Sequence, residues 1–376
     1  MSKTTQTNEN RLMIRGYFAR LRWWLFCKFS ALFLGRKRFE MFLGWNVVDY
    51  MASGIQLRHL RESIVKRFEI AAAEIVQYRF PEGNPSWFPA ATAFDRKLGY
   101  ILSNARLLPK CGAVFLDHGM FLEESMTSMD IFANFGMTES MLPTITLNET
   151  CPVFPFATCF VYYHELVEVM TAALQARAHV SGLKLLLHPD RPEYVDEMLA
   201  FFNFERDEII ESHLPVLVSS CAMIPHIHQR SFASRSDLIF LRNSIMDHLG
   251  NHKSVNNIYI SRKKANSRRL VNEEELEQRL AKAGYISVCF EDLPFAKQLE
   301  TIQTAKSIVA PHGSGLANLV AAQPGTKVCE ILSPEWPRST FARLSKELDL
   351  EYGYVAAIRT NSGDLAPIET ILAQVS

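Results

Sequence analysis

The 376-residue chain lacks an excess of charge of either sign, because 40 Lys and Arg residues balance 40 Asp and Glu residues. This balance argues against a general nucleic-acid-binding protein, which needs a cationic surface. The chain also lacks a Cys-x-x-Cys pair, and its seven cysteines are scattered. We therefore expect neither a disulfide framework nor a structural zinc site, and the cysteine usage favours a reducing cytoplasm.

No apolar run reaches the roughly 20 residues that a bilayer span needs. The aromatic-rich segment 23–34 is interrupted by Lys28, and it lacks the small-residue cleavage signature of a signal peptide. Arginines and lysines flank this segment, so residues 1–38 are typical of a basic amphipathic helix on an anionic membrane surface. A helix packed on the protein's own core is the alternative, and the sequence leaves both interpretations open.

The length predicts two domains, which we place at residues 39–228 and 229–376. In the first, periodicity predicts a helix over 58–80, helices over 160–170 and 193–202, and strands over 113–116, 152–156, 182–188 and 214–219. In the second, strands over 257–262, 286–290, 307–310 and 327–332 alternate with helices over 235–249, 272–283, 295–305, from 314, and 338–348. Such alternation predicts a parallel doubly wound sheet. Its ligand is expected at the strand ends, near Arg262, Glu291, His312 and Glu330.

The turn His312-Gly313-Ser314-Gly315 carries the strongest local signal, since it lies between a buried strand and a helix start. Glycine allows a phosphate to approach the backbone, and a helix start presents unpaired N–H groups with a partial positive charge. A nucleotide diphosphate is therefore the leading candidate ligand. The dinucleotide fingerprint is incomplete, because Ala317 and Asn318 do not supply its last glycine. The glycines could also be ordinary turn formers.

The sequence around this turn resembles glycosyltransferase family 61. The residues that carry the resemblance lie in order in segments 261–273, 291–298, 310–318, 324–325 and 328–331. The aromatic-His block 163–168 is similar to a weaker motif of the same family. The remainder of the first half shows no such match.

The resemblance implies an α/β protein of the GT-B type, with two facing Rossmann-like domains and parallel doubly wound sheets. It also implies inverting transfer from a nucleotide sugar, UDP-linked by expectation, without a cofactor or a bound metal. The chain is compatible with metal independence because it has no close Asp-x-Asp pair, and Asp190 and Asp237 stand alone in the sequence. We expect a bacterial type of member.

Candidate donor-binding residues follow from the matched motifs. Arg262 and Arg269 can neutralise a diphosphate leaving group through bidentate contacts, although solvated basic surface is the alternative interpretation. The turn would hold the diphosphate or the sugar ring, and the carboxylate of Glu330 would accept hydrogen bonds from ribose hydroxyls unless it forms a salt bridge. Asn318 either fixes the turn or reaches a donor hydroxyl. The full donor-binding set is Arg262, Arg269, Asn272, His312, Gly313, Ser314, Gly315, Asn318 and Glu330.

An inverting displacement also needs a general base on the acceptor side. His164 is the first choice, because Glu168 lies four residues on along the same helix face and can orient its imidazole. Glu165 is the second candidate. Asp117 and His118 follow a strand and are further candidates. Each of these residues could instead be structural.

The predicted function is glycosyl transfer to a hydroxyl of a glycan acceptor. A basic N-terminus on the inner face of the membrane would make a lipid-linked glycan of capsule or lipopolysaccharide synthesis the natural acceptor. The expected location is the cytoplasm, with peripheral membrane association. The alternatives are a nucleotide-sugar epimerase or a phosphate-transferring enzyme on the same fold, and a non-catalytic membrane-bound scaffold.

Overall fold

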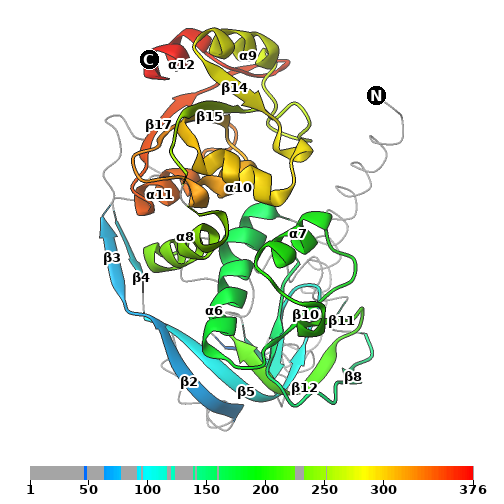
Figure 1. The fold of residues 1–376 in the computed structure, drawn as a ribbon. Helices are drawn as coiled ribbons and strands as arrows, with labels where there is room; N and C mark the ends of the chain where they lie inside the picture. Colours follow the sequence, from blue (N-terminus) through cyan, green and yellow to red (C-terminus); the bar gives the residue numbers. More distant parts are fainter. Residues whose placement is uncertain are drawn as a thin grey trace.

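The computed structural model describes residues 46–48, 63–77, 91–94, 96–116, 120–122, 139, 142–158, 161–224, 233–250 and 252–375. Two β-sheets form the lower and upper parts of the molecule in Figure 1, and helices lie between them. The predicted N-terminal helix within residues 1–38 lies outside the described residues, as do Asp117 and His118. None of the helices in the described ranges is long and apolar enough to cross a membrane.

The first sheet is ten-stranded and mixed, which corrects the prediction of a parallel sheet in this half. Its order is β1-β7-β6-β5-β12-β9-β10-β11, with β2 added beside β5 and β8 beside β12. Strands β12, β9, β10 and β11 are parallel, whereas β5 is antiparallel to β12, β2 and β6. The strands are β1 (Asn46–Val48), β2 (Ile64–Ala71), β5 (Lys97–Leu107), β6 (Val114–Leu116), β7 (Met120–Leu122), β8 (Ile145–Thr146), β9 (Val153–Pro155), β10 (Lys184–Leu187), β11 (Ile209–Glu211) and β12 (Val216–Met223).

The predicted helix over 58–80 is wrong for residues 64–71 and 74–77, where the structure has strands. Residues 64–71 form β2, which pairs along β5, and β3 (Glu74–Gln77) pairs with β4 (Ala91–Phe94). The backbone ladder to β5 satisfies the N–H and C=O groups of this segment, and this distant partner overrides the local helical spacing.

The second sheet is parallel throughout, as predicted, with the order β14-β13-β15-β16-β17. Helices α9 (Glu273–Lys282), α10 (Phe295–Gln303) and α11 (Thr340–Glu347) connect its strands, together with a 3₁₀ helix at Ser314–Ala321. Gly284 ends α9 in the left-handed conformation (φ 84°), as expected of a C-terminal cap. The strands are β13 (Asn256–Ile260), β14 (Tyr285–Val288), β15 (Ala305–Pro311), β16 (Lys327–Leu332) and β17 (Glu351–Ala356).

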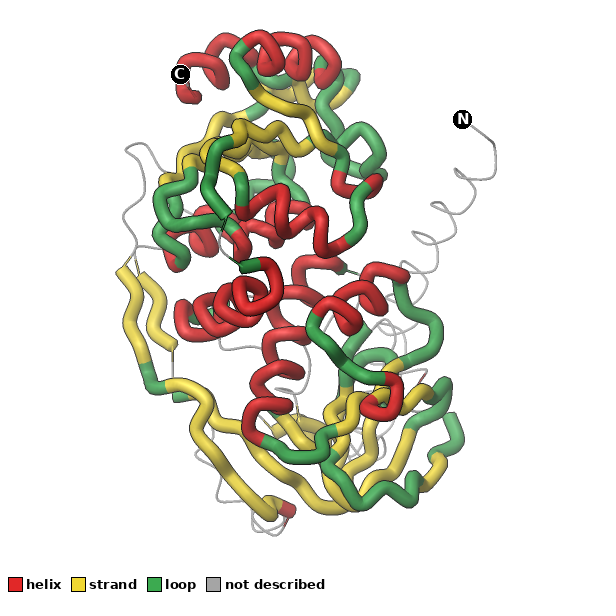
Figure 2. Tube along the Cα trace, in the orientation of Figure 1, coloured by secondary structure: helices red, strands yellow, loops and turns green. Residues whose placement is uncertain are grey.

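The elements after residue 348 were not predicted from the sequence. There β17 adds the last strand of the sheet, and the hairpin of β18 (Ile358–Thr360) and β19 (Gly363–Leu365) follows. The chain then forms α12 (Ile368–Val375), which packs beside α9 at the top of Figures 1 and 2.

Helices α6 (Thr171–His179), α7 (Glu193–Phe201) and α8 (Arg235–Leu249) lie between the two sheets, as Figures 1 and 2 show. One continuous apolar core joins Phe154 of the first sheet, Leu241 of α8 and Ile308 of the second sheet. Glu197 of α7 also accepts the backbone N–H of Phe295 at the start of α10, at 2.6 Å. The two halves are therefore packed together, while the GT-B arrangement itself stays a prediction.

Candidate functional site

The second sheet has its topological switch point between β13 and β15. The chain places β14 on one side of β13 and then crosses to place β15 on the other side. Crossover helices diverge at such a point and leave a crevice at the carboxyl ends of the two strands. Arg262 follows β13, and the turn at His312 and Gly313 follows β15, so the fold brings two predicted donor-binding segments to this crevice.

Arg262 packs directly on the glycine turn. A Cβ atom placed on Gly313 would lie 1.8 Å from the Arg262 Nη1 atom, so only glycine admits the guanidinium at this distance. The guanidinium also donates to the Ser267 carbonyl at 3.0 Å. Burial, followed by the charge of Arg268, lowers the pKa of Arg262. The Arg262 guanidinium is therefore half-buried against the glycine turn, unlike the exposed Lys263, Lys264 and Arg269 beside it in the sequence.

Glu273, the first residue of α9, holds the end of β13 in place. Its Oε1 atom accepts hydrogen bonds from the Tyr259 hydroxyl at 3.0 Å, the Ser261 hydroxyl at 2.9 Å and the Arg262 backbone N–H at 2.7 Å. This residue lies inside the family motif, but no role was predicted for it. The sequence pattern that could have predicted this role is an acidic residue at a helix start, shortly after a strand with a basic end.

His312 and Glu330 form a buried pair at the carboxyl ends of β15 and β16. The His312 Nδ1 atom lies 2.5 Å from Glu330 Oε1, and the Tyr352 hydroxyl donates to Glu330 Oε2 at 2.7 Å. The Glu330 side chain is 0% exposed, so a ribose hydroxyl does not reach it in this structure. The position of Glu330 instead suits orientation of the His312 ring through Nδ1. Nε2 is then the ring nitrogen that Glu330 does not contact.

A cavity of about 480 Å³ lies at the same edge of the sheet, where Ser333 follows β16. Its volume is within the usual range for a small-molecule site. The exposed Arg269 lines it, and so does Arg268, whose pKa is lowered by burial against the charge of Glu330. The half-exposed ring of Trp336 contributes an aromatic surface, with the Arg338 guanidinium 4.7 Å from its centroid.

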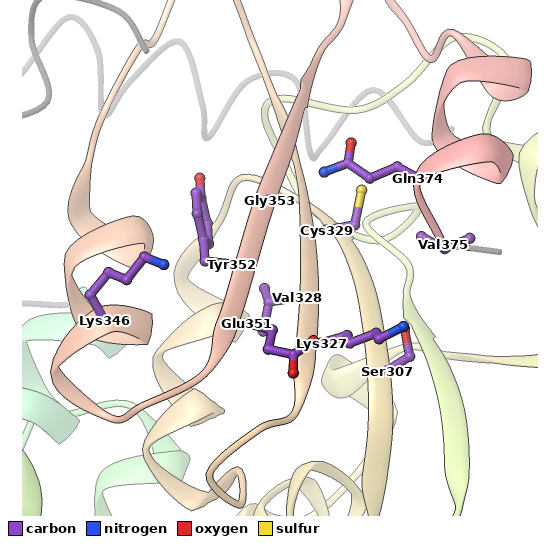
Figure 3. Close-up of a pocket in the computed structure, with 10 residues that line it drawn as sticks. All are labelled: Ser307, Lys327, Val328, Cys329, Lys346, Glu351, Tyr352, Gly353, Gln374 and Val375. Atoms are coloured by element: carbon purple, nitrogen blue, oxygen red, sulfur yellow. The ribbon is translucent and has the colours of Figure 1, made fainter. Parts of the chain in front are cut away.

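A second cavity of about 470 Å³ lies at the opposite, amino end of the same strands. Figure 3 shows Ser307, Lys327 and Glu351 at this end, with Gln374 of α12 reaching over the edge strand. Open α/β sheets bind their ligands at the carboxyl ends of the strands. We therefore assign the candidate site to the cavity beside Arg268 and Arg269.

Two predicted donor-binding asparagines have structural partners. The Asn272 amide donates to the Ala366 carbonyl at 2.9 Å and accepts the Ala366 N–H at 2.8 Å, which fastens the C-terminal segment to α9. Asn318 is fully buried, and its side chain donates to Gln298 at 2.9 Å and accepts the Tyr162 hydroxyl at 2.6 Å. Of the two roles expected for Asn318, the structure favours fixing the turn.

Tyr162 therefore ties the segment before His164 to the helix after the glycine turn. We expect Tyr162→Phe to lower the free energy of unfolding by about 0.5–1.5 kcal/mol, because Asn318 loses its hydroxyl donor. Urea unfolding followed by circular dichroism measures this loss. In an Asn318→Ala background the same change should cost much less, and equal costs in both backgrounds would contradict the pairing.

His164 begins a π-helix, His164–Met170, a rare form that is often found at functional sites. Its Nδ1 atom lies 3.0 Å from Glu168 Oε2, and neither atom has another hydrogen-bond partner within the described residues. Burial lowers the pKa of the His164 imidazole, but the carboxylates of Glu168 and Glu165 raise it by more, so the net shift is upward. Burial raises the pKa of Glu168, and the charges of His164 and Lys97 oppose this rise. The predicted pairing of His164 with Glu168 is confirmed.

Glu165, the second candidate base, is fully buried and accepts a hydrogen bond from the Tyr194 hydroxyl of α7. Its carboxylate is therefore less accessible to an acceptor than the His164 imidazole, which is 20% exposed. Asp237, which stands alone in the sequence, is buried and pairs with Lys97 at 2.8 Å, so it has a structural partner.

Phe341 of α11 connects the two half-sites. Its ring centroid lies 5.2 Å from that of His312 and 5.9 Å from that of Tyr163, the neighbour of His164. The residues predicted for the donor side and for the acceptor side therefore approach each other across one aromatic ring. Phe341 lies on a predicted helix, but no part in the site was predicted for it.

Comparison with known proteins identifies the family to which this chain belongs. The family Glycosyltransferase 61 matches residues 135–329, which is just over half of the chain. A beta-1,2-xylosyltransferase of Oryza sativa subsp. japonica is 37% identical over 92 residues, which cover 22% of this chain and 17% of that protein. A beta-1,2-xylosyltransferase of Arabidopsis thaliana is 30% identical over 116 residues, which cover 27% of this chain and 22% of that protein.

The matched segments thus span only about a fifth of the length of these relatives. Both relatives are plant proteins, so the expected bacterial type of member finds no support among them. The family match, in contrast, includes His164, Arg262 and the glycine turn. This chain belongs to glycosyltransferase family 61.

Proposed function

We propose that this protein transfers a sugar from a nucleotide-sugar donor to a hydroxyl group of a glycan acceptor. The observation that carries the proposal is the contact between Arg262 and Gly313 at the switch point of the parallel sheet. This contact aims a half-buried cation at a helix start whose first N–H groups have no partner within the helix. A diphosphate fits both features.

The nucleotide part of the donor would occupy the cavity of about 480 Å³ whose lining residue Ser267 accepts a hydrogen bond from Arg262. Arg268 and Arg269 would neutralise the diphosphate, and Trp336 offers a surface on which a base can stack. UDP is the proposed nucleotide. Because both relatives are named as xylosyltransferases, a pentose is the proposed sugar.

The proposed reaction is a single displacement with inversion. The acceptor oxygen forms a bond to the anomeric carbon while the bond from that carbon to the phosphate oxygen breaks. His164 accepts the hydroxyl proton through Nε2, since Nδ1 lies beside Glu168. The diphosphate leaves with its added negative charge held by Arg262, Arg268 and Arg269, the function that a divalent ion serves in metal-dependent transferases.

We also propose an acceptor and a location for the protein. A lipid-linked glycan on an anionic membrane surface would suit the basic aromatic N-terminus, and a cytoplasmic location would suit the cysteine usage. The described cysteines, Cys111, Cys151, Cys221, Cys289 and Cys329, are free thiols. A role in capsule or lipopolysaccharide synthesis draws no support from the plant relatives.

A thermal-shift screen of nucleotide sugars and free nucleotides tests the donor site. A ligand that binds only the folded protein stabilises it by about 2.7 kcal/mol at 100 times its Kd, so UDP or a UDP-sugar should raise Tm by several degrees. No shift with any nucleotide at saturating concentration would contradict the proposal. Product analysis then separates the alternatives, because a transferase joins the sugar to a second molecule and an epimerase returns a free isomer.

A further inference from the structure

A cluster of potential metal ligands lies outside the donor and acceptor residues, at the edge of the first sheet. It consists of His188, Asp190 and His213, and one ligand atom from each residue lies within 4.8 Å of those of the other two. The described part of the chain contains one such group of three or more His, Cys, Asp and Glu residues. From this geometry we propose that the cluster binds one divalent transition-metal ion, of which Zn²⁺ is the leading candidate.

The fold brings these three residues together from separate segments. His188 directly follows β10, and His213 follows β11, its parallel neighbour in the sheet. The Ser212 N–H donates to the Leu187 carbonyl at 3.1 Å, so the ladder continues to the point where both histidines leave the sheet. The two imidazole rings lie nearly perpendicular, at 85°, with centroids 5.1 Å apart.

The three residues differ in how firmly they are held. His188 is buried, and its Nδ1 atom accepts the Asp190 backbone N–H at 3.1 Å, which closes the turn that carries the Asp190 carboxylate. A cation at Nδ1 replaces this contact, and a cation at Nε2 requires the other tautomer of the ring. Asp190 and His213 are exposed, and within the described residues their side chains form no hydrogen bond or ion pair. They are therefore able to rotate toward a cation.

The chemistry of the group fits a borderline metal ion. Two imidazoles and one carboxylate are ligands that Zn²⁺ takes at about 2.0–2.2 Å, and imidazole disfavours Mg²⁺ and Ca²⁺. A tetrahedral site of this size separates its ligand atoms by about 3.5 Å. The exposed side chains thus need to move by about 1 Å. Three protein ligands leave a fourth position for water or for an oxygen of a bound molecule.

Such an ion would have a role separate from the proposed transfer step. It would cross-link the segment after β10 to the segment after β11. Both strands are parallel and end at the carboxyl edge of the sheet. The diphosphate site on the second sheet needs no part of this cluster. The metal inference and the proposed function can therefore fail independently.

Titration of the EDTA-treated, full-length protein with Co²⁺ tests the inference, because Co²⁺ replaces Zn²⁺ and gives visible d–d bands when protein ligands bind it. We expect the bands to saturate at one equivalent and to be abolished by added Zn²⁺. His213→Ala and Asp190→Asn should each weaken binding by at least about tenfold. Both residues are exposed, so these variants should fold.

Matched controls are His252→Ala and Asp247→Asn, which change an exposed histidine and an exposed aspartate outside the cluster. They should titrate like the unchanged protein. Zn²⁺ should also raise Tm of the unchanged protein and of both controls, but not that of His213→Ala. The inference is overturned if no saturable band forms, or if the cluster variants and the controls bind Co²⁺ equally well.

Discussion

Replacing His164 with alanine should lower kcat by about 100- to 10,000-fold, the usual contribution of a general base. The affinity for the nucleotide should stay unchanged, because the proposed role of His164 is on the acceptor side, whereas Arg268 and Arg269, which line the proposed donor cavity, lie in the loop between β13 and α9. Single-turnover kinetics and a separate nucleotide-binding measurement distinguish these two effects. His252→Ala is the control, since it removes an exposed histidine that is not among the residues proposed for the site.

The pH dependence tests the same assignment more sharply. A general base must be deprotonated, so kcat/KM should rise with pH, and the midpoint should lie above 6.5 because the net pKa shift of His164 is upward. Glu168→Gln removes the negative charge that favours the imidazolium form, while burial still opposes it. The midpoint should then move to lower pH. An unchanged midpoint, or a move to higher pH, would mean that another group controls this limb of the profile.

The second large effect is expected at the contact between Arg262 and Gly313. Gly313→Ala places a methyl group 1.8 Å from the present position of Arg262 Nη1, and the flexible end of the arginine side chain is the part that can move away. Loss of a hydrogen bond from this cation to the diphosphate costs about 1.5–3 kcal/mol, which corresponds to roughly 10- to 150-fold weaker donor binding. Isothermal titration with the nucleotide measures this change.

Gly353→Ala is a matched control for this variant. Its Cβ atom would lie 2.0 Å from the Gln374 side chain, so it also displaces the end of a flexible polar side chain, but at the opposite edge of the sheet (Figure 3). It should leave donor binding unchanged. Gly313→Ala should have little further effect once Arg262→Ala is present, because both changes remove the same interaction. Additive losses would show that Gly313 acts independently of Arg262.

Much of the second half of the fold could be predicted from local sequence. Helix α8 has the predicted bounds, and α9, α10, β13, β15 and β16 lie within a few residues of theirs. Buried parallel strands are continuously apolar and alternate with helices that carry their own caps, so each element has its own signal. The first half behaves differently, since β2 and β5 form an antiparallel pair from segments far apart in the sequence.

The candidate site was predictable in part for the same reason. The glycine turn, Arg262 and the spacing of His164 and Glu168 are local patterns, and the structure brings Arg262 to the turn and His164 to Glu168. The roles of Asn272, Asn318 and Glu330 could not be derived in this way. Their partners Ala366, Tyr162, His312 and Tyr352 come from other parts of the chain, and no sequence spacing encodes those contacts.

The sequence by itself determined the family of this protein, the parallel sheet of its second half and the two motifs at the centre of its candidate site. These are properties of short segments, whose glycines, charges and periodicity act over a few residues. Only the tertiary structure decided that Phe341 lies between the two half-sites and that Glu330 is fully buried beside His312. It also decided that His188, Asp190 and His213 lie at one edge of the first sheet. Burial and pairing between distant segments arise only when the whole chain packs, and they fix which side chains can reach a ligand.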